Sequence, residues 1–308
     1  MQNEQTPIKR PQWLKVKAPT KASYFEIQDT LKSLDLVTVC QEARCPNMEQ
    51  CWCGDAPTAT FMLMGDTCTR NCLFCSVKTG NPHGVLDREE PFKVGMAISK
   101  MKLDYVVLTS VDRDDLEDLG SGHFADTVSV IKRENPKMIV EALTPDFGGR
   151  EDLIFKFLRS GVDVFAHNME TVERLTPSVR DRRATYKTSL KTLETGKKFS
   201  PAPFTKTSLM LGVGETKEEV VQTLHDLRDV GCDIVTFGQY LSPTARHKKF
   251  LPVKEYIHPD QFDEYQKIAE EMGFVYAASG PLVRSSFKAG EFFIKGVVEK
   301  RRLELAGH

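Results

Sequence analysis

Six short apolar runs, separated by longer segments of mixed polarity, fill the middle of this 308-residue chain. Continuous apolar runs of this length are typical of parallel strands that are buried on both faces. They cover Ala59–Gly65, Asp104–Val111, Met138–Thr144, Val162–His167, Thr207–Val213 and Asp233–Tyr240. The segments between them have helical character at about residues 92–102, 123–134, 151–160, 188–199 and 217–230. This alternation predicts right-handed βαβ units in a barrel or an open α/β sheet.

The helix at about 217–230 has readable ends. Thr216, with Glu219 three positions later, fits a capping box, and Gly231 follows the helix. Further helices are predicted at about residues 23–34, 259–272 and 288–302, and a short apolar run, Phe274–Ala278, precedes the last. No G-x-G-x-x-G follows the first strand, which favours a barrel over a doubly wound sheet.

Polar residues gather directly after the predicted strands. They include Asp112-Arg113-Asp114-Asp115, Thr144-Pro145-Asp146, Asn168-Met169-Glu170, Gly212-Val213-Gly214-Glu215 and Gln239-Tyr240. Because α/β barrels place their active sites at the carboxyl ends of their strands, we expect the functional site there.

Composition and charge are those of an ordinary globular protein. Hydrophobic residues make up 40% and charged residues 28%, and the formal net charge is -1. Bulk charge therefore points to neither a nucleic acid nor a membrane as a partner. The chain lacks an apolar run long enough to span a bilayer, and its first residues do not have the layout of a signal peptide. These features predict a cytosolic protein.

Cysteines are concentrated near the start of the predicted barrel. Seven of the eight lie between Cys40 and Cys75, and in a cytosolic chain such clustering indicates metal binding before disulfides. Three of them, Cys68, Cys72 and Cys75, form a C-x3-C-x2-C motif directly after the first strand. Soft thiolates favour zinc, copper(I) or iron–sulfur clusters. Three thiolates would fill three corners of a 4Fe–4S cluster and leave one iron open to a ligand. Half of a zinc site is the alternative, although its usual spacings differ.

A second trio, Cys40, Cys45 and Cys51, has the spacing C-x4-C-x5-C. Cysteines also pack as small buried residues, but the residues between these three are mostly polar. Two trios are better explained by two clusters than by one site with six ligands. Cys53 is an additional thiol beside Cys51, and Cys232 is expected in the core.

The first trio resembles the cluster loop of the radical S-adenosylmethionine (SAM) superfamily. The two trios and a late Arg284-Ser285-Ser286 together resemble the lipoyl synthase family. The likeness also covers Asp66–Arg70, Val106–Asp115, Leu143–Asp146 and Ser279–Arg284. This resemblance implies a partial (β/α)6 barrel of the radical SAM type, residues 58–258. It also implies an N-terminal extension, 1–57, with the second trio, and a C-terminal extension, 259–308, with the Arg-Ser-Ser motif.

By this resemblance, Cys68, Cys72 and Cys75 hold the 4Fe–4S cluster that binds SAM. Cys40, Cys45 and Cys51 hold an auxiliary 4Fe–4S cluster, whose fourth ligand is carried to Ser286, with Ser285 as the second choice. A serine at this place would otherwise be read as a helix cap. The family motif usually ends in tyrosine, where this chain has Phe287.

The resemblance also implies an activity. Lipoyl synthase inserts two sulfur atoms, at C6 and C8, into an octanoyl chain carried on a lysine of a lipoyl domain. SAM is cleaved to a radical that removes hydrogen from the chain, and the auxiliary cluster is consumed as the sulfur donor. The implied partners are octanoylated 2-oxoacid dehydrogenase E2 subunits and glycine cleavage H protein, a reduced ferredoxin or flavodoxin, and an iron–sulfur carrier that repairs the cluster.

Three further residues are predicted to contact SAM. Glu141 lies on a strand expected to face the barrel interior, where a lone carboxylate would pair with the cofactor's cation; the alternative is a neighbouring basic residue. Asn168 and Arg183 match family positions thought to line the cavity, although Arg183 also fits a surface position. Competing functions are another radical SAM enzyme, such as a methylthiotransferase, and an iron–sulfur electron carrier.

Overall fold

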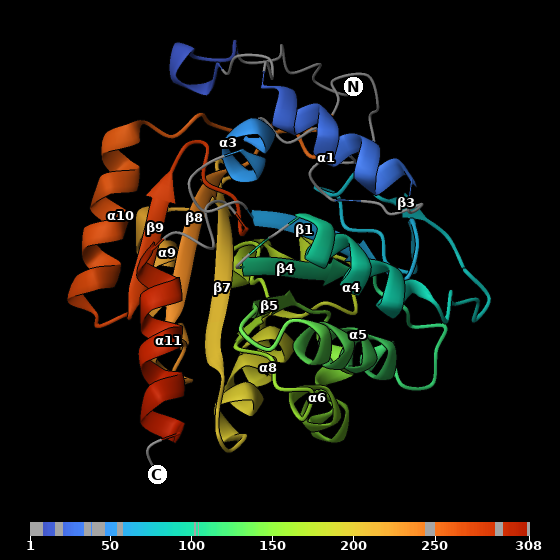
Figure 1. Cartoon of the computed structure of the whole chain (residues 1–308). Coiled ribbons are helices and arrows are strands. Elements are labelled where there is room, and N and C mark those ends of the chain that lie inside the picture. The colour runs from blue at the N-terminus through green and yellow to red at the C-terminus, as the bar shows by residue number, and fades with distance from the viewer. Residues whose placement is uncertain are drawn as a thin grey trace.

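The computed structural model of the chain describes residues 9–15, 21–33, 38, 47–53, 58–101, 103, 105–243, 250–286 and 292–306. Seven parallel strands form one sheet, and their order in the sheet follows their order in the chain (Figure 1). The strands are β1 (Thr58–Leu63), β4 (Tyr105–Ser110), β5 (Ile139–Leu143), β6 (Val164–Ala166), β7 (Phe204–Leu211), β8 (Ile234–Gln239) and β9 (Tyr276–Gly280). The α/β architecture predicted from the apolar runs is confirmed.

Helices connect successive strands of the sheet. They include α4 (Glu90–Met101), α5 (Ser121–Glu134), α6 (Glu151–Leu158), α8 (Tyr186–Lys198), α9 (Lys217–Asp229) and α10 (Pro259–Glu271). Alternate strand residues pack against these helices, and the residues between them face the opposite side of the sheet. In Figure 1 the helices α4, α5, α6 and α8 surround the curved sheet from outside, as in a barrel that is not closed.

The seventh strand lies beyond the six that the sequence predicts. β9 pairs in parallel with β8, from Ile234↔Tyr276 to Gly238↔Gly280. The apolar run at Phe274–Ala278 marked its start, but the strand continues through Ser279 and Gly280. The C-terminal extension therefore adds a strand to the sheet and brings its next residues to the carboxyl ends of the neighbouring strands.

The opposite end of the sheet is closed by the last helix, α11 (Phe292–Ala306). Val298 is buried in a small cluster with Val107 and with the first residues of four strands, Tyr105, Ile139, Val164 and Ile234. Arg302 donates to the carboxylate of Asp163, with 2.7 Å between Nη2 and Oδ1. These contacts lie at the amino ends of the strands, so the carboxyl ends remain for the site.

The predicted capping box at α9 is confirmed. The Thr216 hydroxyl accepts from the Glu219 amide, and the Glu219 carboxylate accepts from the Thr216 amide. We expect Thr216→Ala to lower the free energy of unfolding by about 1 kcal/mol, because two amide groups at the helix start lose an ordered partner. Urea unfolding measures the change, and Thr216→Ser is the matched control that retains the hydroxyl. Equal losses in both variants would contradict this account.

Two described helices that precede the sheet, α1 (Ala22–Ser33) and the short α3 (Met48–Trp52), lie over its carboxyl-end side in Figure 1. The rings of Tyr24 and Trp52 stack with centroids 5.2 Å apart, which joins the two helices. None of the helices in the described part of the chain is long and apolar enough to cross a membrane.

Candidate metal centre

The cysteine loop follows β1 at the carboxyl end of the sheet. Its base is fixed by two short strands, β2 (Thr67–Cys68) and β3 (Lys78–Thr79), which pair in parallel. The Sγ atom of Cys68 accepts from the backbone amides of Arg70 and Asp112, both at 3.4 Å. The Sγ atom of Cys72 accepts from the Asp181 amide at 3.3 Å. The loop thus presents thiols whose sulfur atoms already face backbone donors.

Burial works against the ionised form of these thiols. It raises the pKa of Cys68 to about 12 and the pKa of Cys72 to about 11, although the amide donors oppose the shift. A thiolate is stable here only beside a cation, and iron provides one while amide hydrogen bonds tune its sulfur ligands. The donor set therefore fits an iron–sulfur cluster. Within the described residues, no three His, Cys, Asp or Glu side chains are grouped closely enough to hold a single metal ion.

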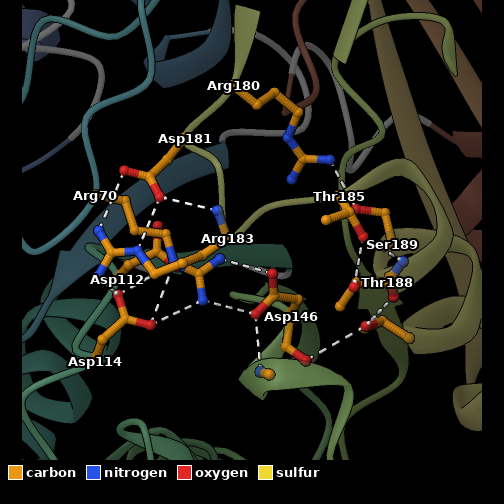
Figure 2. Close-up of polar contacts among 12 residues, drawn as sticks. Arg70, Asp112, Asp114, Asp146, Arg180, Asp181, Arg183, Thr185, Thr188 and Ser189 are labelled. Carbon is orange, nitrogen blue, oxygen red and sulfur yellow. Dashed lines mark hydrogen bonds and ion pairs between the residues drawn. The ribbon is translucent and has the colours of Figure 1, made fainter. Parts of the chain in front are cut away.

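Arg70, inside the cysteine motif, anchors the loop to two strands (Figure 2). Its guanidinium donates to both carboxylate oxygens of Asp146, at 2.6 and 2.9 Å, and to the Asp114 carboxylate at 2.9 Å. Asp112 lies 3.4 Å away as a third anion. Asp112 and Asp114 follow β4, Asp146 follows β5, and only 6% of Arg70 is exposed. Paired carboxylates raise the pKa of Arg70, so it stays a cation.

A second arginine fixes the loop backbone from the other side. Arg183 donates to the Thr69 carbonyl at 2.7 Å and pairs with Asp181 at 2.8 Å. The Asp181 carboxylate in turn accepts from the Asn71 amide at 3.0 Å. Figure 2 shows Arg183 beside the Arg70 cluster, at the same end of the sheet. The conformation of the cysteine loop is therefore set by side chains from three separate loops.

Arg180 differs from both of these arginines. It is 9% exposed, and the Nη1 atom donates to Ser189 Oγ at 2.7 Å and to the Met169 carbonyl at 3.3 Å. Its buried Nε has no hydrogen-bond partner among the described residues. Arg180 directly precedes Asp181, whose amide donates to Cys72 Sγ at 3.3 Å, so Arg180 lies beside the cysteine loop, and its charge opposes the rise that burial causes in the pKa of the Cys72 thiol. The Arg180 charge also lowers the pKa of the Glu170 carboxyl against the larger effect of burial, and its unpartnered Nε donor makes this a suitable place for a bound anion.

Glu170, near Arg180, has a strained backbone. Its φ is 67°, in the left-handed region that side chains other than glycine rarely adopt. Two hydrogen bonds to β7 hold it there, from Glu170 N to Ser208 O at 3.0 Å and from Met210 N to Glu170 O at 2.8 Å. Burial raises the pKa of Glu170, and Asn168 Nδ2 donates to its carboxylate at 3.1 Å. Strain of this kind is characteristic of functional sites.

A model of the radical SAM superfamily matches residues 62–227, and a model of the N-terminal domain of lipoyl synthase matches residues 1–45. The chain is 56% identical to the mitochondrial lipoyl synthase of Phytophthora infestans over 96% of this chain and 78% of that one. It is 58% identical to the mitochondrial lipoyl synthase of Yarrowia lipolytica over 94% and 83%. The chain belongs to the lipoyl synthase family of the radical SAM superfamily.

Solved structures agree with the fold of this lipoyl synthase family member. Methylornithine synthase superimposes with a TM-score of 0.51 at 15% identity, over 91% of this chain and 92% of that one. A maturase of the FeFe-hydrogenase gives a TM-score of 0.55 at 14% identity, over 89% and 71%. The partial barrel of the radical SAM type is thus confirmed, and membership of the superfamily implies a 4Fe–4S cluster and SAM.

The predicted cytosolic location is wrong. The curated relatives of this lipoyl synthase family member in Phytophthora infestans, Schizosaccharomyces pombe and Yarrowia lipolytica are all named as mitochondrial. Composition and the signal-peptide criterion distinguish secreted and membrane proteins from the rest. They carry no information that separates the cytosol from an organelle.

The residues predicted for the auxiliary cluster are described only in part. Cys40 and Cys45 lie outside the described residues. Cys51 is half-buried on α3, and Cys53 follows directly after that helix. Ser285 and Ser286 lie in a turn after β9. The helix-cap alternative is untested, because residues 287–291 are outside the described part of the chain.

Glu141 is not the lone carboxylate that the sequence suggests. Both of its oxygens accept from Lys206 Nζ at 2.8 Å, and one also accepts from the Tyr105 hydroxyl at 2.6 Å. The carboxylate is 1% exposed and lies among the first residues of the strands. Its pairing with a basic neighbour, the alternative considered above, removes the reason for placing the cofactor's cation there.

Asn168 and Arg183 do lie at the carboxyl end of the sheet. Asn168 supports Glu170, and Arg183 holds the cysteine loop. The predicted site residues did not include Arg70 or Arg180, whereas Asp146 lies in a polar segment that the sequence places at the carboxyl ends of the strands. The first had a visible signal, since Arg70 lies between Cys68 and Cys72 in the cysteine motif.

Proposed function

We propose that this chain is a lipoyl synthase, which inserts two sulfur atoms, at C6 and C8, into protein-bound octanoyl-lysine. The observation that carries the proposal is identity of 53–58% to curated lipoyl synthases over nearly the whole chain. Both cysteine trios and the Arg-Ser-Ser motif lie inside the matched length. The thiols with amide donors at the carboxyl ends of the strands support it independently.

The proposed ligands follow from this assignment. Cys68, Cys72 and Cys75 would hold the 4Fe–4S cluster that binds SAM. Cys40, Cys45, Cys51 and Ser286 would hold the auxiliary 4Fe–4S cluster. When bound, the two clusters and SAM would supply the electron, the radical and the sulfur that insertion into unactivated C–H bonds requires.

The residues of the chain position and shield these groups. Arg70 and Arg183 keep the cysteine loop in shape before any cluster is bound. Arg180 offers a buried positive charge to an anionic group, and the carboxylate of SAM is the anion that the family brings to this end of the sheet. Asn168 would act there through Glu170, which it holds at 3.1 Å. These side chains replace water around the reacting groups, as a radical reaction requires.

The division of the chain follows the same proposal. Residues 1–57 would carry the auxiliary-cluster cysteines, residues 58–258 the barrel, and residues 259–308 the Arg-Ser-Ser motif. The proposed partners are octanoylated lipoyl-domain proteins, namely 2-oxoacid dehydrogenase E2 subunits and glycine cleavage H protein. A reduced ferredoxin or flavodoxin would donate electrons, and an iron–sulfur carrier would rebuild the spent cluster.

Anaerobically purified and reconstituted protein tests the proposal. We expect about eight irons per chain, in two 4Fe–4S clusters, and cleavage of SAM after reduction with dithionite. An octanoyl-lysine peptide should then be converted to a product that carries two added sulfur atoms. The same peptide without its octanoyl group is the control and should gain no sulfur. Clusters without SAM cleavage would indicate an electron carrier, and SAM cleavage with a methylthiolated product would indicate a different radical SAM enzyme.

A further inference from the structure

Asn47, which precedes α3, has an unexpected hydrogen bond. It occupies the N-cap position of α3, where asparagine is among the most favoured residues because its side chain accepts from an amide of the first turn. No such bond forms here. The side chain instead donates from Nδ2 to the carbonyl oxygen of Leu282, 235 residues away, at 2.7 Å. Asn47 is 3% exposed, and the bond to the half-buried Leu282 is partly buried.

Leu282 belongs to the segment that carries the Arg-Ser-Ser motif. The segment leaves β9 through a turn, in which Val283 N donates to Gly280 O at 3.0 Å. Ser285 and Ser286 follow three and four residues after Leu282. On the other side, Cys51 lies four residues after Asn47 on α3. One hydrogen bond therefore joins the N-terminal segment of the second trio to the C-terminal segment of the serines.

Strand β8 of the barrel contacts the segment that carries the Arg-Ser-Ser motif. A Cβ atom on Gly238, in β8, would lie 2.1 Å from the Val283 carbonyl oxygen, a distance that real Cβ atoms do not show. Arg284 Nη1 donates to the Val283 carbonyl at 2.8 Å and reaches the Gln239 carbonyl at 3.4 Å. The segment therefore lies directly on the end of β8, and Asn47 holds it from the opposite side.

We propose that Asn47 is a positioning residue that holds the Arg284–Ser286 segment against α3, so that Cys51 and the serine ligand face one cluster. The inference rests on the proposed function, because it takes Cys51 and a serine of this motif as ligands of the same auxiliary cluster. At the N-cap position of α3, Asn47 bonds to a distant carbonyl and not to its own helix. Such a departure from local preference is expected where function overrides local stability. The cluster ligands contributed by the two ends of the chain then share a site before the cluster is bound.

Two substitutions separate this role from ordinary helix capping. Asn47→Ser keeps a side chain that caps helices well but is too short to reach Leu282. Asn47→Ala can neither cap α3 nor donate to Leu282. A residue that only stabilises α3 would tolerate serine, whereas a residue that holds the distant segment would not. Asn135→Ser, at the end of α5, is the matched control, because the hydrogen bonds of the Asn135 side chain among the described residues are those with Ser99.

The first measurement is hydrogen–deuterium exchange in the metal-free full-length protein, over peptides that cover residues 280–286. We expect roughly tenfold faster exchange in both Asn47 variants, as the loss of one partly buried hydrogen bond implies. The second measurement uses chains in which Cys68, Cys72 and Cys75 are alanine, so that any reconstituted cluster is the auxiliary one. In that background, release of iron to a chelator should be several-fold faster in both Asn47 variants and unchanged in Asn135→Ser.

Wild-type behaviour of Asn47→Ser in either measurement would overturn the inference, whatever Asn47→Ala does. A failure of the proposed function would give a different result. If Cys51 is not a cluster ligand, Cys51→Ala in the same background would bind as much iron as the protein that retains Cys51. If the Asn47 variants do not fold, Gly238→Ala attacks the segment from the other side. It should accelerate exchange over residues 280–286 and release of iron alike, and an unchanged Gly238→Ala protein would overturn the inference.

Discussion

Replacing Arg70 by glutamine is expected to lower the free energy of unfolding of the cofactor-free protein by about 3–5 kcal/mol. The guanidinium is 6% exposed and lies among the carboxylates of Asp112, Asp114 and Asp146. Its removal leaves three anions close together without their shared cation, and two of them lose bidentate partners. The loop should then lose its fixed shape, so incorporation of the first cluster should fail as well. Urea unfolding and iron analysis measure the two effects.

Arg150→Gln is the matched control for this substitution. Arg150 also forms a bidentate pair, with Asp152 at 2.7 Å for the shorter contact, but both side chains are at least half exposed. Solvent screens such a pair, so we expect no measurable change in the free energy of unfolding. Equal and small effects of the two substitutions would show that the Arg70 cluster does not hold the loop.

The strands of the barrel could be predicted because burial on both faces leaves a local signal. The apolar run at 104–111 became β4 (Tyr105–Ser110), with its ends within one residue. β9 gave a weaker signal because Tyr276-Ala277-Ala278-Ser279-Gly280 mixes small and polar residues at the edge of the sheet. Its position beside β8 is set by tertiary pairing, which local patterns do not contain.

The sequence indicates where the cysteines of the candidate site lie, but not how its charged side chains pair. A thiol trio is readable because its members lie within eight residues of each other. The partners of Arg70 are 44 and 76 positions away, and Lys206, which pairs with Glu141, is 65 positions away. Whether a buried carboxylate is free or paired depends on such distant neighbours. The expectation that Glu141 is a lone carboxylate was wrong for this reason.

The two buried arginines of the site differ in their hydrogen-bond partners. This difference suggests that one charge stabilises the fold and the other binds a ligand. Arg70 has three carboxylates, whereas Arg180 has a hydroxyl, a carbonyl and an Nε without a partner among the described residues. A buried guanidinium donor without a hydrogen-bond partner costs free energy in the unliganded protein, even with Glu170 as a nearby anion. A bound anion would accept a hydrogen bond from the unpartnered Nε of Arg180. The side chain should therefore stabilise the protein only when the ligand is present.

Arg180→Met should therefore leave the free energy of unfolding of the cofactor-free protein within about 1 kcal/mol of wild type, or raise it. With the first cluster reconstituted, affinity for SAM should fall roughly 10- to 100-fold, because a charge-assisted hydrogen bond to its carboxylate is lost. Equilibrium dialysis with SAM measures the change, and methylthioadenosine, which lacks the amino-acid group, is the control ligand whose affinity should not move. Arg180→Lys should recover part of the affinity, since it keeps the charge but loses the planar fork. A loss of several kcal/mol in the cofactor-free protein, or equal weakening of both ligands, would instead assign Arg180 a structural role like that of Arg70.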